Sequence, residues 1–195
     1  TYSGELNWID FNNDQKLDLF INGNGYGNTG ILLNNGGNDF SLVSTEDLGI
    51  SRLQEVDAAW TDLNGDNYPD LMQVGYDKTS ELYFNNNGES MTKVSAKPTN
   101  FPQYRDGRAD WADMDNDGDM DLVMGGSPGN GYGYNYVYKN DGDTVFTKIS
   151  TSFPRHNRGS ANWGDLNGDE YPDLLFSGED GWKENETKIY INDKN

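Results

Sequence analysis

Apolar residues in this chain occur in short runs of three to five, separated by polar stretches rich in glycine, asparagine and aspartate. The runs contain mainly β-branched and aromatic residues, and none continues with the spacing of an amphipathic helix. In the second quarter of the chain, for example, such runs lie at 71–74, 82–84 and 91–94. Short runs bounded by turn-forming residues are typical of β-strands. We therefore expect an all-β fold.

The same order of runs appears four times. Each repeat has a run containing tryptophan, an aspartate-rich nonapeptide, a second run, a polar or glycine-rich connection, and a third run. The first three repeats continue with a hairpin turn (Asn35-Gly36, Asn87-Gly88 or Asp141-Gly142) and a fourth run. Four short antiparallel strands in about fifty residues describe the blade of a β-propeller.

We predict a single β-propeller domain, residues 1–195, with four blades at approximately 1–50, 51–102, 103–154 and 155–195. The fourth blade is incomplete because no fourth run follows the strand around Ile189. Blades of this size form either a four-bladed ring or part of a ring of seven or eight blades, and a ring assembled from two chains is a further alternative. The outer edge of the Ile189 strand is expected to be unpaired or to pair with another molecule.

The nonapeptides begin at Asp10, Asp62, Asp113 and Asp165, so the spacings are 62 − 10 = 52, 113 − 62 = 51 and 165 − 113 = 52 residues. Positions 1, 3, 5 and 9 carry side-chain oxygen atoms, which suit a hard cation such as calcium. The expected ligands of up to four calcium ions are Asp10, Asn12, Asp14 and Asp18; Asp62, Asn64, Asp66 and Asp70; Asp113, Asp115, Asp117 and Asp121; and Asp165, Asn167, Asp169 and Asp173.

An EF-hand is excluded as the source of these loops. The EF-hand loop requires a bidentate glutamate at position 12 and helices on both sides. Position 12 is occupied here by Ile21, Gln73, Met124 and Phe176, and strands are expected on both sides of each nonapeptide.

A longer pattern includes a tryptophan two residues before each nonapeptide, at Trp8, Trp60, Trp111 and Trp163. We expect these tryptophans to pack between blades. Together with hairpins such as Tyr138-Lys-Asn-Asp-Gly142, the pattern resembles the FG-GAP/VCBS repeats of integrin α subunits and many bacterial surface proteins. The resemblance implies calcium bound by positions 1, 3, 5 and 9, and by the backbone carbonyl of position 7, which is Lys16, Tyr68, Asp119 or Tyr171. The first loop contains no glycine and departs most from the family pattern.

The formal net charge is −19, and 13 of the 33 acidic residues occupy the proposed ligand positions. This acidity argues against nucleic acid or an anionic membrane as partner, and no apolar run is long enough to insert into a membrane. The chain has no cysteine. This composition and the family resemblance fit an extracellular or cell-surface protein.

All five arginines and the only histidine precede or lie close to a tryptophan run, in segments interpreted as connections between blades. In a propeller these connections share one edge with the loops between the second and third strands, opposite the nonapeptides. We therefore interpret a cationic and aromatic surface there as a candidate site for sugars or acidic ligands. The candidate residues are Arg52, Arg105, Arg108, Arg155, Arg158, Tyr26, Tyr132, Tyr134 and Trp182. His156 is interpreted as a solvated loop residue.

Three hypotheses for function follow. The first is a calcium-stabilised extracellular adhesion or binding module that recognises carbohydrate or protein ligands without catalysis. The second is a polysaccharide lyase or hydrolase on a propeller scaffold, although no nucleophile–base triad is evident with one histidine and no cysteine. The third is a structural repeat protein that forms homo-oligomers through open blade edges. The first is favoured, with no catalytic residue assigned.

Overall fold

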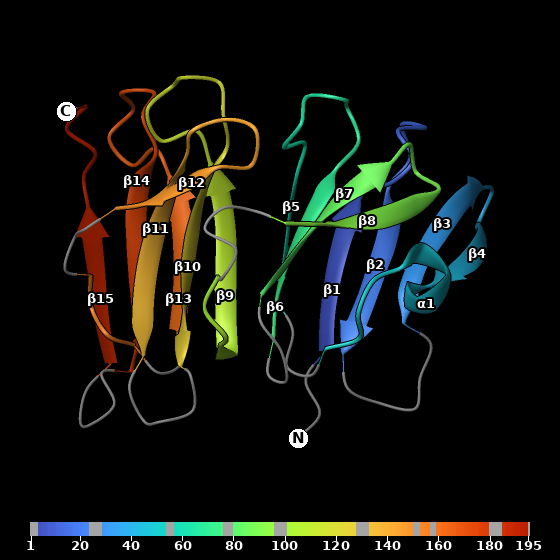
Figure 1. The fold of residues 1–195 in the computed structure, drawn as a ribbon, viewed down its shortest axis with the longest axis horizontal. Helices are drawn as coiled ribbons and strands as arrows, with labels where there is room; N and C mark the ends of the chain where they lie inside the picture. The colour runs from blue at the N-terminus through green and yellow to red at the C-terminus, as the bar shows by residue number, and fades with distance from the viewer. Residues whose placement is uncertain are drawn as a thin grey trace.

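The computed structural model describes residues 4–23, 29–53, 57–75, 80–95, 101–127, 133–149, 153–156, 159–179 and 185–194. The side chains of 105 and 106 also lie outside the description. In the described part of the chain, four antiparallel sheets stand side by side and one short helix is present (Figure 1). The all-β prediction is confirmed.

Each sheet corresponds to one sequence repeat and is called blade 1 to blade 4 in chain order. Blade 1 contains β1 (Gly4–Ile9), β2 (Asp18–Gly23), β3 (Gly30–Gly36) and β4 (Asp39–Ser44). Blade 2 contains β5 (Asp57–Thr61), β6 (Asp70–Val74), β7 (Glu81–Asn86) and β8 (Ser90–Val94). Blade 3 contains β9 (Arg105–Ala112), β10 (Asp121–Ser127), β11 (Tyr134–Asn140) and β12 (Phe146–Lys148). Blade 4 contains β13 (Gly159–Gly164), β14 (Asp173–Glu179) and β15 (Asn185–Tyr190).

Within every blade, each strand pairs with the next one in the sequence, as expected for a meander. The first strands β1, β5, β9 and β13 contact one another in this order, so the blades follow each other in a row. The row is open: β5 and β9 lie between β1 and β13, and these two strands do not belong to a common sheet (Figure 1). The described residues of blade 4 form three strands, and none of them pairs with the outer edge of β15.

The helix α1 (Thr45–Leu48) was not expected from the sequence, because one turn is too short to produce a helical pattern of apolar residues. The hydroxyl oxygen of Ser44 accepts a hydrogen bond from the backbone N–H of Asp47 and caps the first turn. Gly49, with φ of 80°, ends the helix in the left-handed conformation. The helix buries Leu48 in the same apolar cluster as Met91 of β8, and so contributes to the packing between blades 1 and 2.

Large apolar side chains fill the space between adjacent blades. The ring of Trp60 lies edge-on against Phe20 of blade 1, with 5.1 Å between the ring centroids. Trp111 packs in one cluster with Met72 and Leu82 of blade 2, and its indole N–H donates to the carbonyl of Ala59 at 3.3 Å. Trp163 packs in one apolar cluster with Val123 and Val137 of blade 3. The packing prediction is confirmed for these three tryptophans and is wrong for Trp8, which is 63% exposed because none of the four described blades packs against it.

Among the described residues, no helix has both the length and the apolar character that crossing a membrane requires.

Candidate metal centres and the opposite edge

The four nonapeptides connect the first and second strands of their blades, as the sequence predicted. Since β1, β5, β9 and β13 run in the same direction, all four loops lie along one edge of the row of blades, at the top of Figure 1. In each blade, the proposed ligands at positions 1, 3 and 5 belong to one loop, whereas position 9 is the first residue of the second strand. The loops of different blades form separate candidate centres.

The aspartate at position 1 holds each loop closed by accepting backbone hydrogen bonds from positions 5 and 6. In the second loop, Asp62 accepts from the N–H of Asp66 at 3.1 Å and from that of Asn67 at 2.8 Å. Asp10, Asp113 and Asp165 accept the equivalent pairs. These bonds hold the pKa of Asp165 below its usual range, the N–H of Glu170 having the largest effect. The backbone hydrogen bonds alone thus orient the carboxylate at position 1.

Positions 3 and 5 turn further oxygen atoms toward the same loop. Asp66 accepts from the backbone N–H of Tyr68 at 2.9 Å through one carboxylate oxygen, while the amide oxygen of Asn64 accepts from the N–H of Asp66 at 3.0 Å. In the third loop, ligand atoms of Asp113, Asp115 and Asp117 all lie within 4.8 Å of one another. Carboxylates gathered so closely repel each other, and an oxygen-only donor set of this kind fits a calcium ion.

The aspartate at position 9 is located differently, since it is buried in every blade. Asp70 accepts one hydrogen bond from the N–H of Leu63 at 2.9 Å and another from the N–H of Asn85 at 2.8 Å. Asp18, Asp121 and Asp173 make the same two bonds in their blades. Burial raises the pKa of Asp70 and of Asp121 to about 6, against the opposing effect of these bonds. Position 9 therefore ties the loop to the third strand in blades 1 to 3, and to Asn192 just after the third strand in blade 4.

The first loop has the same conformation as the others, although it lacks glycine. Positions 4 and 6 are left-handed in every loop, with φ of 56° at Asn13 and 65° at Gln15. The equivalent residues are Gly65 and Asn67, Asn116 and Gly118, and Gly168 and Glu170. Asparagine and glycine tolerate this conformation well, whereas Gln15 and Glu170 adopt it at a cost. The departure of loop 1 from the family pattern is thus accommodated by the backbone.

Lysine side chains approach three of the four loops. Lys16 lies 2.8 Å from the carboxylate of Asp14, and Lys194 lies 3.5 Å from that of Asp169. Lys139 of β11 contacts both Asp115 and Asp117. The hydrogen bond from Lys16 lowers the pKa of Asp14, and the pKa of Asp117 is lowered by the N–H of Asp119 and then by Lys139. The pKa of Lys139 is raised by the same pair of carboxylates. Each ammonium group is a local counter-ion for its loop.

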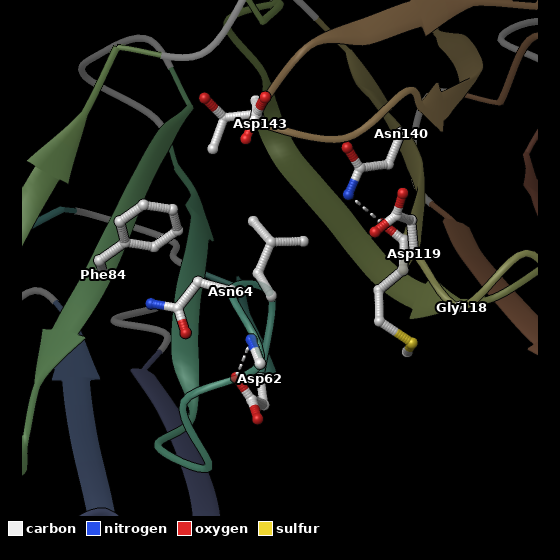
Figure 2. A pocket seen from close by; sticks show the side chains of 11 residues that line it. Asp62, Asn64, Phe84, Gly118, Asp119, Asn140 and Asp143 are labelled. Atoms are coloured by element: carbon white, nitrogen blue, oxygen red, sulfur yellow. Dashed lines mark hydrogen bonds between the residues drawn. The ribbon is translucent and has the colours of Figure 1, made fainter.

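A cleft of about 510 Å³ separates the second and third loops (Figure 2). Asp62 and Asn64 line it from blade 2, together with Phe84 of β7, while Asp119 and Asp143 line it from blade 3. At the two neighbouring junctions an asparagine reaches across to the preceding loop, from Asn85 to the carbonyl of Phe11 and from Asn192 to that of Met114. The equivalent Asn140 donates within its own blade, to the carbonyl of Met120 at 3.3 Å.

The opposite edge of the blades carries part of the predicted arginine and aromatic surface. The guanidinium of Arg155 lies 5.3 Å from the ring centroid of Tyr134, and Tyr134 is stacked on Tyr136 with 6.2 Å between centroids. The ammonium group of Lys148 lies 3.3 Å above the centre of the Tyr136 ring. These four side chains form one continuous group, which we call the tyrosine–cation cluster.

Several of the other predicted ligand-binding residues are distributed differently. Arg105 and Arg108 belong to β9, so the interpretation that all five arginines lie in connections is wrong. Arg108 donates to the carbonyl of Gly107, and Arg52 is exposed in the connection before β5. Tyr26, Tyr132, Arg158 and Trp182 lie outside the described residues.

Sequence reasoning missed Tyr136 and Lys148, and misjudged His156. The alternation Tyr134-x-Tyr136-x-Tyr138 was the signal that three tyrosines share one face of a strand. Lys148 gave no signal, because its position over Tyr136 depends on the pairing of β11 with β12. The interpretation of His156 as solvated is wrong: the ring is buried beside Gly125 and Asn135 of blade 3 and Gly159 of blade 4, with Nε2 3.8 Å from Glu186.

Four meander sheets in a row, each with an aspartate-rich loop between its first two strands, define a repeat protein of the β-propeller class. The chain matches the model of the FG-GAP-like repeat over residues 10–73, 62–124 and 113–176, and it belongs to this family. The resemblance noted in the sequence is thereby confirmed.

Among solved structures, the chain is similar to one that describes specific recognition of non-reducing terminal N-acetylglucosamine by an Agrocybe aegerita lectin. The TM-score is 0.57 at 20% sequence identity, and the match covers 98% of this chain and 52% of the lectin chain. This chain therefore spans about half the length of that protein, and the likeness supports the fold. No curated protein matches the chain significantly in sequence.

Proposed function

We propose that this protein is a non-catalytic carbohydrate-binding module of the extracellular space or cell surface, stabilised by calcium in its four loops. The observation that carries the ligand proposal is the tyrosine–cation cluster of Tyr134, Tyr136, Lys148 and Arg155. Aromatic rings offer flat apolar surfaces against which sugar rings stack, and cations beside them attract acidic or hydroxyl-rich groups. A protein ligand at the same surface is the alternative.

The preceding blade shows how unusual this cluster is within the chain. Lys93 of β8 is equivalent to Lys148 of β12. Lys93 pairs with Tyr83 and Lys148 pairs with Tyr138, and each of these tyrosines pairs in turn with the residue directly after position 9. Lys93, however, forms an ion pair of 2.7 Å with Glu81, whereas the residue at that place in blade 3 is Tyr136. In blade 3 the lysine therefore lies over a tyrosine ring, whereas in blade 2 it pairs with a carboxylate. This difference supports a role for the blade 3 surface that the blade 2 surface does not share.

Calcium is proposed from the donor sets of the loops. Positions 1, 3 and 5 provide carboxylate or amide oxygens, which backbone N–H groups hold at all three positions of the second loop, and the family resemblance adds the carbonyl of position 7. A cation that binds only the folded loops stabilises the folded state by mass action. In this proposal calcium has a structural role on one edge, and the ligand binds on the other. The similarity to a lectin supports a sugar as the ligand class.

The ligand proposal is tested with a glycan array followed by calorimetric titration of the best glycans, including N-acetylglucosamine-terminated oligosaccharides. Replacing Tyr134 or Tyr136 by alanine is expected to weaken binding about tenfold, which corresponds to the loss of one stacking contact. Lys148→Ala should also weaken binding, whereas the matched variant Lys93→Ala should not. Binding that none of the cluster variants affects would contradict the proposed surface. Release of new reducing ends or unsaturated sugars from a bound polysaccharide would favour the enzyme alternative.

The calcium proposal is tested by titrating calcium into protein prepared in chelator while melting temperature and stoichiometry are measured. Calcium should raise the melting temperature, and the Asp117→Asn variant should lose one binding site. Lys139→Gln removes a cation that competes for the third loop, so calcium affinity there should rise by up to about fivefold, the scale of an exposed ion pair. Identical melting curves with calcium and with chelator would show that the loops are turns without metal.

A further inference from the structure

The two ends of the row of blades expose apolar surfaces that are buried at every internal junction. We call the surface of a blade that faces the preceding blade its leading face, and the surface that faces the following blade its trailing face. Inside the chain, each junction packs one leading face against one trailing face. The leading face of blade 1 and the trailing face of blade 4 are covered by no described residue.

The trailing faces are built from equivalent residues. In each blade, the residue ten places after the first aspartate of the nonapeptide lies on the second strand and pairs with an apolar residue of the third strand. The four pairs are Phe20–Ile31, Met72–Leu82, Val123–Val137 and Leu175–Ile189. In blades 1 to 3 all six side chains are buried. In blade 4, by contrast, Ile189 is 56% exposed, and Leu166 and Ile191 of the same blade are exposed to the same degree. A trailing face of the usual composition is thus present without its partner.

The leading faces show the same contrast. Trp60, Trp111 and Trp163 pack against the blade before them, while Trp8 and Leu6 of β1 are largely exposed. The fourth strand repeats the pattern: Met91 and Phe146 are buried against preceding blades, whereas the equivalent Phe40 is 45% exposed. Blade 1 therefore presents the tryptophan-bearing surface that a trailing face receives at each internal junction.

A polar contact also crosses two of the three internal junctions, the exception being that of blades 2 and 3, where Asn140 donates within its own blade. The side-chain amide of Asn85 donates both to Pro69 of its own blade and, across the junction, to the carbonyl of Phe11. Asn192 does the same with Pro172 and Met114. In blade 1 the equivalent Asn34 donates to the carbonyl of Leu17 in its own blade. The residue of blade 4 that is equivalent to Phe11 and Met114 is Leu166. If a blade 4 preceded blade 1, the carbonyl of its Leu166 would therefore be the acceptor for Asn34.

We propose that the trailing face of blade 4 receives the leading face of blade 1 from a second copy of this chain. The contact repeats the internal junctions: Trp8 lies over Leu175 and Ile189 of the second copy, and Asn34 donates to the carbonyl of its Leu166. Because the two faces differ, the contact is heterologous, so each copy retains a free face of each kind until the assembly closes. The proposal is independent of the ligand-binding function, since neither face includes the tyrosine–cation cluster.

The test is the oligomeric state of this chain in calcium, measured by sedimentation velocity over two orders of magnitude in protein concentration. The wild-type chain should self-associate, with a shift of tryptophan emission to shorter wavelength as Trp8 becomes buried. Trp8→Asp on one face and Ile189→Asp on the other should each raise the dissociation constant about a hundredfold or more, because each places a charge at the centre of the contact. Val145→Asp is the matched control, an exposed apolar residue away from both end faces, and it should associate like the wild type.

Mixing the two variants distinguishes this contact from a symmetric one. The Trp8→Asp chain keeps a normal blade 4 face, and the Ile189→Asp chain keeps a normal blade 1 face, so an equimolar mixture should form a one-to-one complex. Ile191→Asp provides a second blade 4 variant and should behave like Ile189→Asp. A wild-type chain that stays monomeric at all concentrations would overturn the proposal. Association that only one of the two face variants abolishes would also overturn it. The same holds if the Trp8→Asp and Ile189→Asp chains form no complex when mixed, provided that circular dichroism shows both variants to be folded.

Discussion

Replacing the buried aspartate at position 9 separates the structural role of the nonapeptide from its proposed metal role. In Asp70→Ala, the backbone N–H groups of Leu63 and Asn85 lose the acceptor that they share, at 2.9 and 2.8 Å. Leaving a buried donor without a partner costs about 1–3 kcal/mol, so the free energy of unfolding should fall by about 2–6 kcal/mol. For a domain with about 5–15 kcal/mol of stability, this is a large loss. Asp70→Asn, which keeps one acceptor oxygen, should lose less.

The decisive assay is urea denaturation in chelator and in calcium, with Asp66→Ala as the matched control. Asp66 at position 5 is largely exposed, and its contribution should depend on the cation, so Asp66→Ala should lose stability mainly in calcium. Asp70→Ala should lose stability in both conditions. If Asp70→Ala had the stability of the wild type in chelator, the two backbone hydrogen bonds would not hold the loop, and the assignment of position 9 to the scaffold would be refuted.

Two further predictions concern strain and pH. Gln15→Gly should raise the free energy of unfolding by about 1 kcal/mol, because Gln15 has φ of 65° and glycine adopts this conformation without a Cβ clash; a denaturation midpoint at or below that of the wild type would contradict this. Asp57 has its pKa raised from 3.8 to about 6 by burial, with the N–H of Ala109 acting in the opposite direction. Because the pKa of Asp57 is higher in the folded state than in the unfolded state, its protonated carboxyl group stabilises the folded state. This stabilisation is fully present below pH 3.8 and is lost as the pH rises through about 6. Asp57→Asn should therefore match the wild type near pH 4 and exceed it near pH 7.5 by at most about 3 kcal/mol, and an equal difference at both pH values would argue against the assignment.

The strands and the repeat were predictable because both depend on local pattern. Runs such as 71–74 and 82–84 became β6 and β7 with changes of only a residue or two at the ends, and the nonapeptides appeared between the expected strands. The composition of each loop also indicated which side chains would meet, since a connection of only eight residues leaves little freedom. Local sequence therefore carried most of the fold and the geometry of the candidate metal centres.

Features that depend on contact between blades were not predictable in the same way. Trp8 has the same sequence context as Trp60, and only the absence of a covering blade makes it exposed. His156 lies in a polar segment, yet the approach of blades 3 and 4 buries it. Lys148 faces Tyr136 because of strand register, and Lys93 faces Glu81 in the same geometry for the same reason. Residues at equivalent positions of the repeats thus lie in different environments, because different residues surround them. The sequence of a single repeat does not contain this information.

The nonapeptide combines two tasks that sequence reasoning had treated as one. Positions 1 and 5 turn their oxygens into the loop, where backbone N–H groups fix them. Position 9 turns inward and accepts from the backbone N–H of an asparagine, which lies in the third strand in blades 1 to 3 (Asn34, Asn85 or Asn140) and just after it in blade 4 (Asn192). In two blades the side chain of that asparagine also reaches the loop of the preceding blade. A cation that orders one loop would consequently act on its own third strand and, through it, on the adjacent blade. Blades 2 and 3, where Asn140 donates within its own blade, are joined instead by the apolar cluster that contains Trp111. Stabilisation by calcium should therefore be cooperative along the row of blades, and a single loop variant should lower the midpoint of one global transition without producing a separate one.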